Sequence, residues 1–225
     1  MLNGHWDCHH LLLDFETVDG DTIRIARPWL TFLVDRYSRC IVGFSLCTTP
    51  PSGDAIFDAV RMGIKRKDKM LARLGGMTNS WECHGVPAAV TTDAGRGSHS
   101  EKLRGASEVL QFSLHFKPQR KPWLTGQIES WFNSLERPGG KSLRALSLGE
   151  ASWIVTKWIV DIYHQQLDPA LDCTPAQMWG SGLQKTPILR VVPDDLVDVD
   201  FQQPIPRAID RAQGAPPSSS GSLEF

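Results

Sequence analysis

The stretch RPWLTFLVDRYSRCIVGFSL, residues 27–46, decides the fold class. Two runs rich in leucine, valine, isoleucine and phenylalanine flank the polar segment DRYSR at 35–39. Apolar, β-prone runs on either side of a short polar segment are typical of two antiparallel strands joined by a turn. The stretch therefore predicts a β-hairpin. The strands and helices before and after it can then be assigned in chain order.

Strands and helices alternate around this hairpin. HWDCHHLLLD (5–14) predicts a strand before it. After PPSGD (50–54), Ser52 or Asp54 can cap a helix that runs to about residue 74. VPAAVTTD (86–93) then reads as a short buried strand that ends in a carboxylate. The order so far is three strands, a helix and a further strand.

Three more segments complete this alternation. Ser98 and Glu101 have the spacing of a capping box that opens a helix to about Leu110. QFSLHFKP (111–118) predicts a strand, and helices are expected over 125–137 and 148–166. A strand meander followed by strand–helix alternation predicts a mixed α/β sheet, antiparallel at first and parallel later.

The chain of 225 residues is long enough for one large domain with an appendage. We expect a core over 1–180, a short extended segment over 181–207 that could begin a C-terminal β-barrel, and a disordered tail over 208–225. There is no apolar run of 18 residues and no signal-peptide pattern. We therefore expect a cytoplasmic protein, from a bacterial cell or encoded by a phage, with no membrane partner.

Charge and cysteine content exclude little by themselves. Residues 1–150 hold 19 Lys and Arg against 16 Asp and Glu, whereas residues 151–225 hold 5 against 9. Basic residues gather at 61–73 and 117–121, which suits a phosphate backbone but equally suits a solvated surface. The five cysteines form no CxxC pair, so neither a disulfide framework nor a zinc knuckle is indicated, and most should be core residues.

Three acids stand out by position. Asp7 lies on the first strand, Asp93 ends a later strand, and Glu129 begins a predicted helix, with 35 residues between the last two. Taken alone, each also fits an ordinary turn or surface acid. A soft-metal site on Cys8 and His10 is an alternative, but two ligands do not make a site, and strand alternation places Asp7 on the opposite face.

The order of the motifs resembles the catalytic core of the DDE integrases and transposases, especially the retroviral-type core of Mu-like bacterial transposases. The likeness spans about residues 5–180. It rests on the two aspartates and the glutamate, on the DRYSR hairpin, on VTTDAGRG (90–97), on RKPWLTGQIESWFNSL (120–135) and on YHQQLDPALDCTPAQMW (163–179). The sequence departs from the family at Ala94, where asparagine is common, and at Glu136, near which many members carry a basic residue.

The resemblance implies a ribonuclease H-like fold, a mixed five-stranded sheet with flanking helices. It also implies that Asp7, Asp93 and Glu129 are catalytic and bind two Mg²⁺ ions, with Mn²⁺ as a substitute. The reaction would be cleavage at DNA 3′ ends followed by strand transfer. The expected partner is double-stranded DNA, both element ends and target, contacted by four basic residues: Arg96, Lys117, Arg120 and Lys121. A homo-oligomer on DNA, with a dimer of cores, is expected, and the chain resembles an excised core.

His9 shares a strand face with Asp7 and is a candidate for a supporting role, although a structural histidine is the commoner case. Asp14 and Asp35 are interpreted as structural acids. Two other functions remain open. One is a ribonuclease H-like nuclease that never joins strands, and the other is a catalytically silent core that only binds DNA or a partner.

Overall fold

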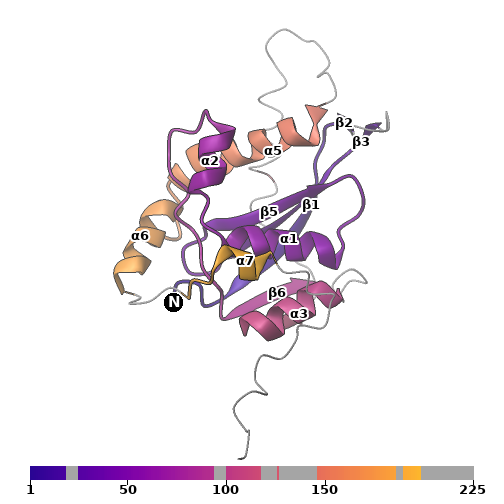
Figure 1. Cartoon of the computed structure of the whole chain (residues 1–225). Helices are drawn as coiled ribbons and strands as arrows, with labels where there is room; N and C mark the ends of the chain where they lie inside the picture. Colours follow the sequence, from indigo (N-terminus) through magenta and orange to yellow (C-terminus); the bar gives the residue numbers. More distant parts are fainter. Residues whose placement is uncertain (19–24, 94–99, 118–125, 127–145, 186–189, 199–225) are drawn as a thin grey trace, which may run out of the picture.

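The computed structural model describes residues 1–18, 25–93, 100–117, 126, 146–185 and 190–198 (Figure 1). Its main sheet has five strands in the order β5-β4-β1-β6-β7. Their bounds are Trp6–Leu12 (β1), Trp29–Asp35 (β4), Ile41–Cys47 (β5), Ala89–Asp93 (β6) and Ser113–Lys117 (β7). The pairs β1–β4 and β4–β5 are antiparallel, whereas β1–β6 and β6–β7 are parallel. The predicted mixed sheet is confirmed.

The hairpin turn is held by Asp35, which is fully buried. Its carboxylate accepts hydrogen bonds from the backbone N–H and hydroxyl of Ser38, at 2.8 and 2.7 Å, and from the backbone N–H of Asn3 at 3.0 Å. Arg39 adopts a left-handed φ of 60° at the end of the turn. The buried aspartate thus satisfies backbone donors that the turn leaves without strand partners, which confirms its structural interpretation.

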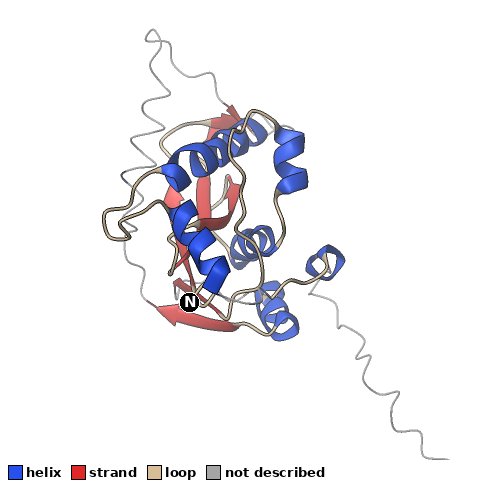
Figure 2. Cartoon of the chain, turned by 90° about the vertical axis from the view of Figure 1, so that its left-hand side faces the viewer, coloured by secondary structure: helices blue, strands red, loops and turns tan. Residues whose placement is uncertain are grey.

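Helix α1 (Gly53–Ile64) packs on β4 and β5 and lies beside α3 (Glu101–Leu110). Ser52 caps α1 by accepting the backbone N–H of Ala55. The helix approaches the sheet closely at Gly43 of β5, where an added Cβ would collide with backbone atoms of Ala59 and Gly63. Figure 2, turned by 90°, shows the helices clustered about the strands.

The single helix expected from Ser52 to about residue 74 is wrong, because α1 ends at Ile64 and α2 covers Asp68–Leu74. Lys65 is extended at the break. The Lys67 side chain turns into the core, where Nζ donates to the carbonyl oxygens of Gly63 at 2.9 Å and of Cys83 at 2.5 Å. These two carbonyl oxygens satisfy the buried amino group close to the point where the chain leaves the helical path.

Two other expectations need adjustment, and a third stays a prediction. The cap of α3 is Ser100, which accepts the backbone N–H of Leu103, and not Ser98, which lies outside the described residues. The helix expected over 148–166 is α5 (Leu148–Lys157) continued by a π-helix (Trp158–Ile162) and a 3₁₀ turn (Tyr163–Gln165). The helix expected over 125–137 lies, apart from residue 126, outside the described residues.

A second, three-stranded sheet was not expected from the sequence. It joins β3 (Ile25–Ala26), β2 (Thr17–Val18) and β8 (Leu146–Ser147) in that order. Each strand has only two residues, too few for a recognisable pattern. The pairing of β2 with β8 links segments that are far apart in the chain.

The C-terminal part of the described chain is helical rather than extended. Helix α6 covers Pro175–Lys185 and α7 covers Asp194–Val197, so the extended segment expected over 181–207 is not what its described residues form. The proposed division into domains, and the tail over 208–225, stay predictions. Among the described residues, no helix is long and apolar enough to span a membrane.

Candidate carboxylate site

Two of the three expected acids lie on neighbouring parallel strands. Asp7 of β1 stands opposite Thr91 of β6 in the register, and Asp93 follows Thr91 by two residues at the end of β6. Because side chains alternate along a strand, this register assigns Thr91 to the same sheet face as Asp7, whereas the carboxylate of Asp93, at the end of β6, reaches His10 on the other face of β1. The Asp7 and Asp93 side chains are 30% and 26% exposed, so both carboxylates can be reached from solvent.

Asp7 has a cationic partner that the sequence did not reveal. Arg36, in the hairpin turn, donates from Nε to Asp7 Oδ2 at 3.0 Å and from Nη2 to Asp7 Oδ1 at 2.5 Å. This bidentate hydrogen bonding raises the pKa of the guanidinium, although desolvation opposes it. A metal ion at Asp7 would have to share or replace this contact.

Two histidines and a threonine complete the surroundings of Asp7. His5 lies with Nε2 3.9 Å from Asp7 Oδ1 and is hydrogen-bonded through the same nitrogen to the Thr91 hydroxyl. The His5 ring stacks on His115 of β7 with centroids 5.7 Å apart, and His115 is the register partner of Thr91. The spacing of His5 and Asp7 could have indicated this cluster, whereas His115 is visible only through the strand register.

Asp93 is close to the other histidine of β1. His10 Nε2 lies 3.8 Å from Asp93 Oδ1, while His10 Nδ1 is 2.9 Å from the Thr31 hydroxyl. Burial lowers the pKa of His10, although the nearby Asp93 charge opposes this. Cys8 Sγ lies 3.9 Å from His10 Nε2.

A soft-metal site on Cys8 and His10 is not supported within the part of the chain that the structure describes. There, no third histidine, cysteine or acid completes a close ligand group with them. Burial also raises the pKa of the Cys8 thiol, which favours its protonated form. The His9 ring packs near Phe32, with centroids 5.4 Å apart, and a supporting role for it stays a prediction.

The donor set at Asp7 and Asp93 suits magnesium, because hard carboxylate oxygens are the ligands that Mg²⁺ prefers. The third expected ligand, Glu129, lies outside the described residues. Asp14 is 76% exposed and pairs with Arg27 at 3.0 Å, well suited to a surface role.

The expected DNA contacts fall mostly outside the described residues. This holds for Arg96, Arg120 and Lys121, while Lys117 ends β7 and its side chain is not described. The basic run at 61–73 is largely neutralised from within the chain. Arg61 and Lys65 pair with Asp198, Arg66 pairs with Asp68, and Lys67 is buried. This run therefore offers less charge to a phosphate backbone than its sequence indicates.

Comparison with solved structures agrees with the fold. A chain of the simian T-cell lymphotropic virus intasome in complex with PP2A regulatory subunit B56 gamma matches at a TM-score of 0.50 and 16% identity. The match covers 86% of this chain and 60% of that one. The HTLV-2 integrase catalytic core domain in complex with magnesium matches at a TM-score of 0.48 and 15% identity, over 80% of this chain and 97% of that one. The strand order of the main sheet and the likeness to the intasome chain show the ribonuclease H-like fold that the sequence predicts.

The particular family follows from the sequence. The TnsB C-terminal domain family matches residues 7–142, and the chain belongs to this family of DDE transposases and integrases. A transposase for transposon Tn552 from Staphylococcus aureus is 25% identical over 191 residues. The alignment covers 80% of this chain but only 38% of that transposase, so the chain corresponds to a part of its relative. Asp7, Asp93 and Glu129 all lie within the matched range.

Proposed function

We propose that this chain is the catalytic core of a DNA transposase that cleaves DNA at 3′ ends and joins them to a target. The observation that carries the proposal is the pair of exposed carboxylates, Asp7 and Asp93, on adjacent parallel strands of an integrase-type sheet. Membership of the TnsB C-terminal domain family supports it. Glu129 is the proposed third acid.

The proposed reaction is two successive phosphoryl transfers. Water first breaks a phosphodiester at the element end and leaves a free 3′ hydroxyl. That hydroxyl then attacks a target phosphodiester, so one P–O bond forms as another breaks. Two bound Mg²⁺ ions would activate the attacking oxygen and stabilise the leaving oxygen.

Four residues of this chain have proposed roles at the Mg²⁺ site: three acids as ligands and Arg36 as a residue that releases Asp7. Asp7, Asp93 and Glu129 are the proposed ligands that would hold the two ions. Three acids that converge repel one another, which favours cation binding at their meeting point. Arg36 would release Asp7 when the cations bind, and its freed guanidinium would then lie close to the scissile phosphate, where bidentate contact is favourable.

The proposed partner is double-stranded DNA, bound by a homo-oligomer of cores, and the proposed location is the cytoplasm. Arg96, Lys117, Arg120 and Lys121 are the proposed phosphate contacts. Such contacts release counterions, so the affinity for DNA should fall steeply as salt rises. A nuclease without joining and a silent DNA-binding core are the competing outcomes of the test below.

The test uses the whole chain, an oligonucleotide with a recessed 3′ hydroxyl end, and a supercoiled plasmid, with Mg²⁺ or Mn²⁺. We expect metal-dependent nicking and joined products, both lost in Asp7→Asn and Asp93→Asn. Asp14→Asn is the matched control, because Asp14 lies on the same N-terminal segment but is exposed and paired with Arg27. Nicking without joined product would favour the nuclease. Activity that survives EDTA or Asp93→Asn would refute the proposed site.

A further inference from the structure

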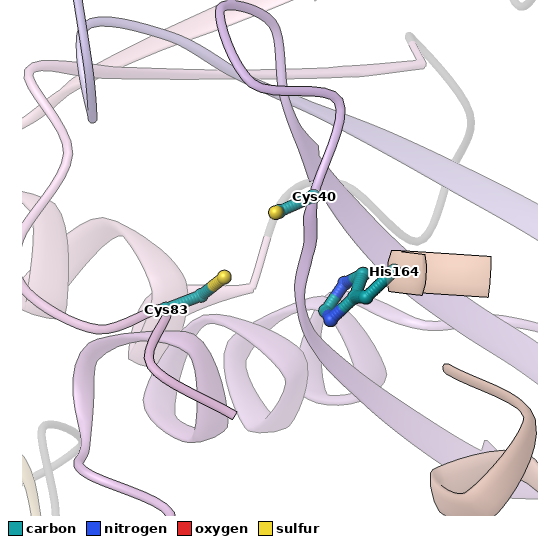
Figure 3. Close-up of side chains that lie close together, drawn as sticks. All are labelled: Cys40, Cys83 and His164. Atoms are coloured by element: carbon teal, nitrogen blue, oxygen red, sulfur yellow. The ribbon is translucent and has the colours of Figure 1, made fainter. Parts of the chain in front are cut away.

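A second group of potential ligands lies away from the carboxylates. Cys40, Cys83 and His164 come from three separate segments: the end of the hairpin turn, the loop after α2, and the 3₁₀ turn after the π-helix. All three are buried, with 0%, 2% and 2% of their surface exposed. Figure 3 shows the two thiols and the imidazole converging from these segments. Their positions in the sequence have no zinc-like spacing, and the sequence indicated only core cysteines.

The distances within the group approach those of a metal site. One ligand atom from each residue lies within 4.8 Å of the other two. A zinc ion holds sulfur at about 2.3 Å and nitrogen at about 2.0–2.1 Å, so two ligands of a tetrahedral site lie about 3.5–3.8 Å apart. A contraction of the group by about 1 Å would therefore let all three atoms reach one ion. Two cysteines and one histidine are also the residue types that zinc prefers.

A cavity beside the group can supply a fourth ligand. It has a volume of about 250 Å³ and is lined by all three residues together with Asn79 and Glu82. A zinc site with three protein ligands takes water or another oxygen donor as its fourth. A water in the cavity can take that position.

Charge balance also favours a divalent ion here. Two thiolates and a neutral imidazole around Zn²⁺, with water as the fourth ligand, have no net charge, so the complex adds no charge to an interior in which Lys67 already lies close to Cys83. Burial lowers the pKa of His164 to about 3, so the ring is neutral, as ligation requires. Burial raises the pKa of the Cys40 thiol, whereas a bound metal would remove its proton.

Two existing contacts compete with metal binding. Cys40 Sγ donates to the carbonyl oxygen of Pro175 at 3.1 Å, and His164 Nε2 accepts the backbone N–H of Ile41 at 3.1 Å. A bound metal would replace the Cys40 thiol proton that is donated to Pro175. It would also compete with the Ile41 N–H for a lone pair of the His164 ring. The net worth of one or two hydrogen bonds is small beside the binding free energy of a structural zinc ion.

We propose that Cys40, Cys83 and His164 bind a zinc ion that ties the hairpin turn to the loop after α2 and to the turn that follows the π-helix. The site is separate from the carboxylates and does not depend on the proposed DNA chemistry. It would fix the start of β5, which lies two strands from Asp7 in the sheet.

The test measures bound zinc by mass spectrometry of the metal, in the whole chain purified under reducing conditions. We expect one zinc per chain in the wild type and in the control Cys173→Ser, and background zinc in Cys83→Ser. His164→Gln is a useful second variant, because its amide oxygen can take the place of Nε2 and still accept the Ile41 N–H but is a poor zinc ligand. It should lose zinc while keeping its far-UV circular dichroism.

Replacing zinc by Co²⁺ gives a readout that does not need a folded variant. Thiolate ligation produces a sulfur-to-cobalt charge-transfer band, which oxygen ligands at Asp7 and Asp93 cannot produce. We expect that band in the wild type and in Asp7→Asn. The proposal is overturned if the wild type binds no zinc and shows no such band, or if Cys83→Ser keeps both. A disulfide between Cys40 and Cys83 in the chain as purified, without metal, would also overturn it.

Discussion

Replacing Asp161 by asparagine should destabilise the fold, because this carboxylate anchors the loop after α2. Asp161 lies in the π-helix with its side chain only 9% exposed. It accepts the backbone N–H groups of Thr78 and Asn79, at 3.0 and 2.9 Å, and the Thr78 hydroxyl at 2.9 Å. Lys157 Nζ donates to its second oxygen at 3.0 Å. Asparagine keeps one acceptor oxygen but loses the charge and the Lys157 contact.

The magnitude follows from those contacts. A hydrogen bond to a charged group contributes about 1.5–3 kcal/mol, so Asp161→Asn should lower the free energy of unfolding by about 2 kcal/mol. At about 2–4 °C per kcal/mol for a chain of this size, Tm should fall by about 4–8 °C. Urea denaturation and calorimetry measure the two quantities. Asp58→Asn is the control, because Asp58 is half-exposed and pairs with Arg61 at 3.4 Å, a contact worth about 1 kcal/mol at most.

The effect should also depend on pH. Burial opposes ionisation of Asp161, but hydrogen bonds from Lys157, Asn79 and Thr78 outweigh it and hold the pKa below its ordinary value. A lowered folded-state pKa adds stability that is complete above the unfolded-state pKa, about 3.9, and is lost as pH falls through the folded-state value. The difference between wild type and Asp161→Asn should be constant from about pH 6 to 8 and shrink below about pH 4. A variant as stable as wild type at pH 7, or a difference that does not shrink in acid, would refute this reasoning.

Two further predictions concern the sheet and the site. Gly43→Ala should cost about 3 kcal/mol in thermal unfolding, since its Cβ would meet backbone atoms of Ala59 and Gly63 that cannot move independently; a change of less than about 1 kcal/mol would show that α1 does not pack so closely. Arg36→Gln should tighten Mn²⁺ binding by up to about 5-fold in an electron paramagnetic resonance titration, because an exposed ion pair with Asp7 is worth at most about 1 kcal/mol. Weaker binding in Arg36→Gln would mean that the arginine supports the metal site instead of competing for it.

Much of the main sheet was predictable because its signals are local. The hairpin at 27–46 and the strand that ends at Asp93 each have an apolar run and a polar boundary within a few residues. The break between α1 and α2 was not predictable in this way. It depends on Lys67 reaching the carbonyl oxygen of Cys83, a contact between segments that the sequence does not show to be neighbours.

In the candidate site, too, local features could be predicted from the sequence, whereas contacts between distant segments could not. Strand alternation was enough to separate Asp7 from Cys8, and the end of a strand was enough to single out Asp93. The Arg36 contact requires the register of β1 against the hairpin, which only the folded sheet fixes. The group of Cys40, Cys83 and His164 depends on three long-range packing relationships and has no sequence motif of its own.

The most direct test of the proposed function is a crystal of the whole chain soaked in Mn²⁺, with an anomalous difference map at the manganese edge. We expect a peak between the carboxylates of Asp7 and Asp93, with Arg36 moved away from Asp7 and Glu129 beside the ion. Asp93→Asn crystals treated in the same way should lose the peak. A map with no manganese at these two acids, in crystals where the Arg36–Asp7 pair is intact, would contradict the account.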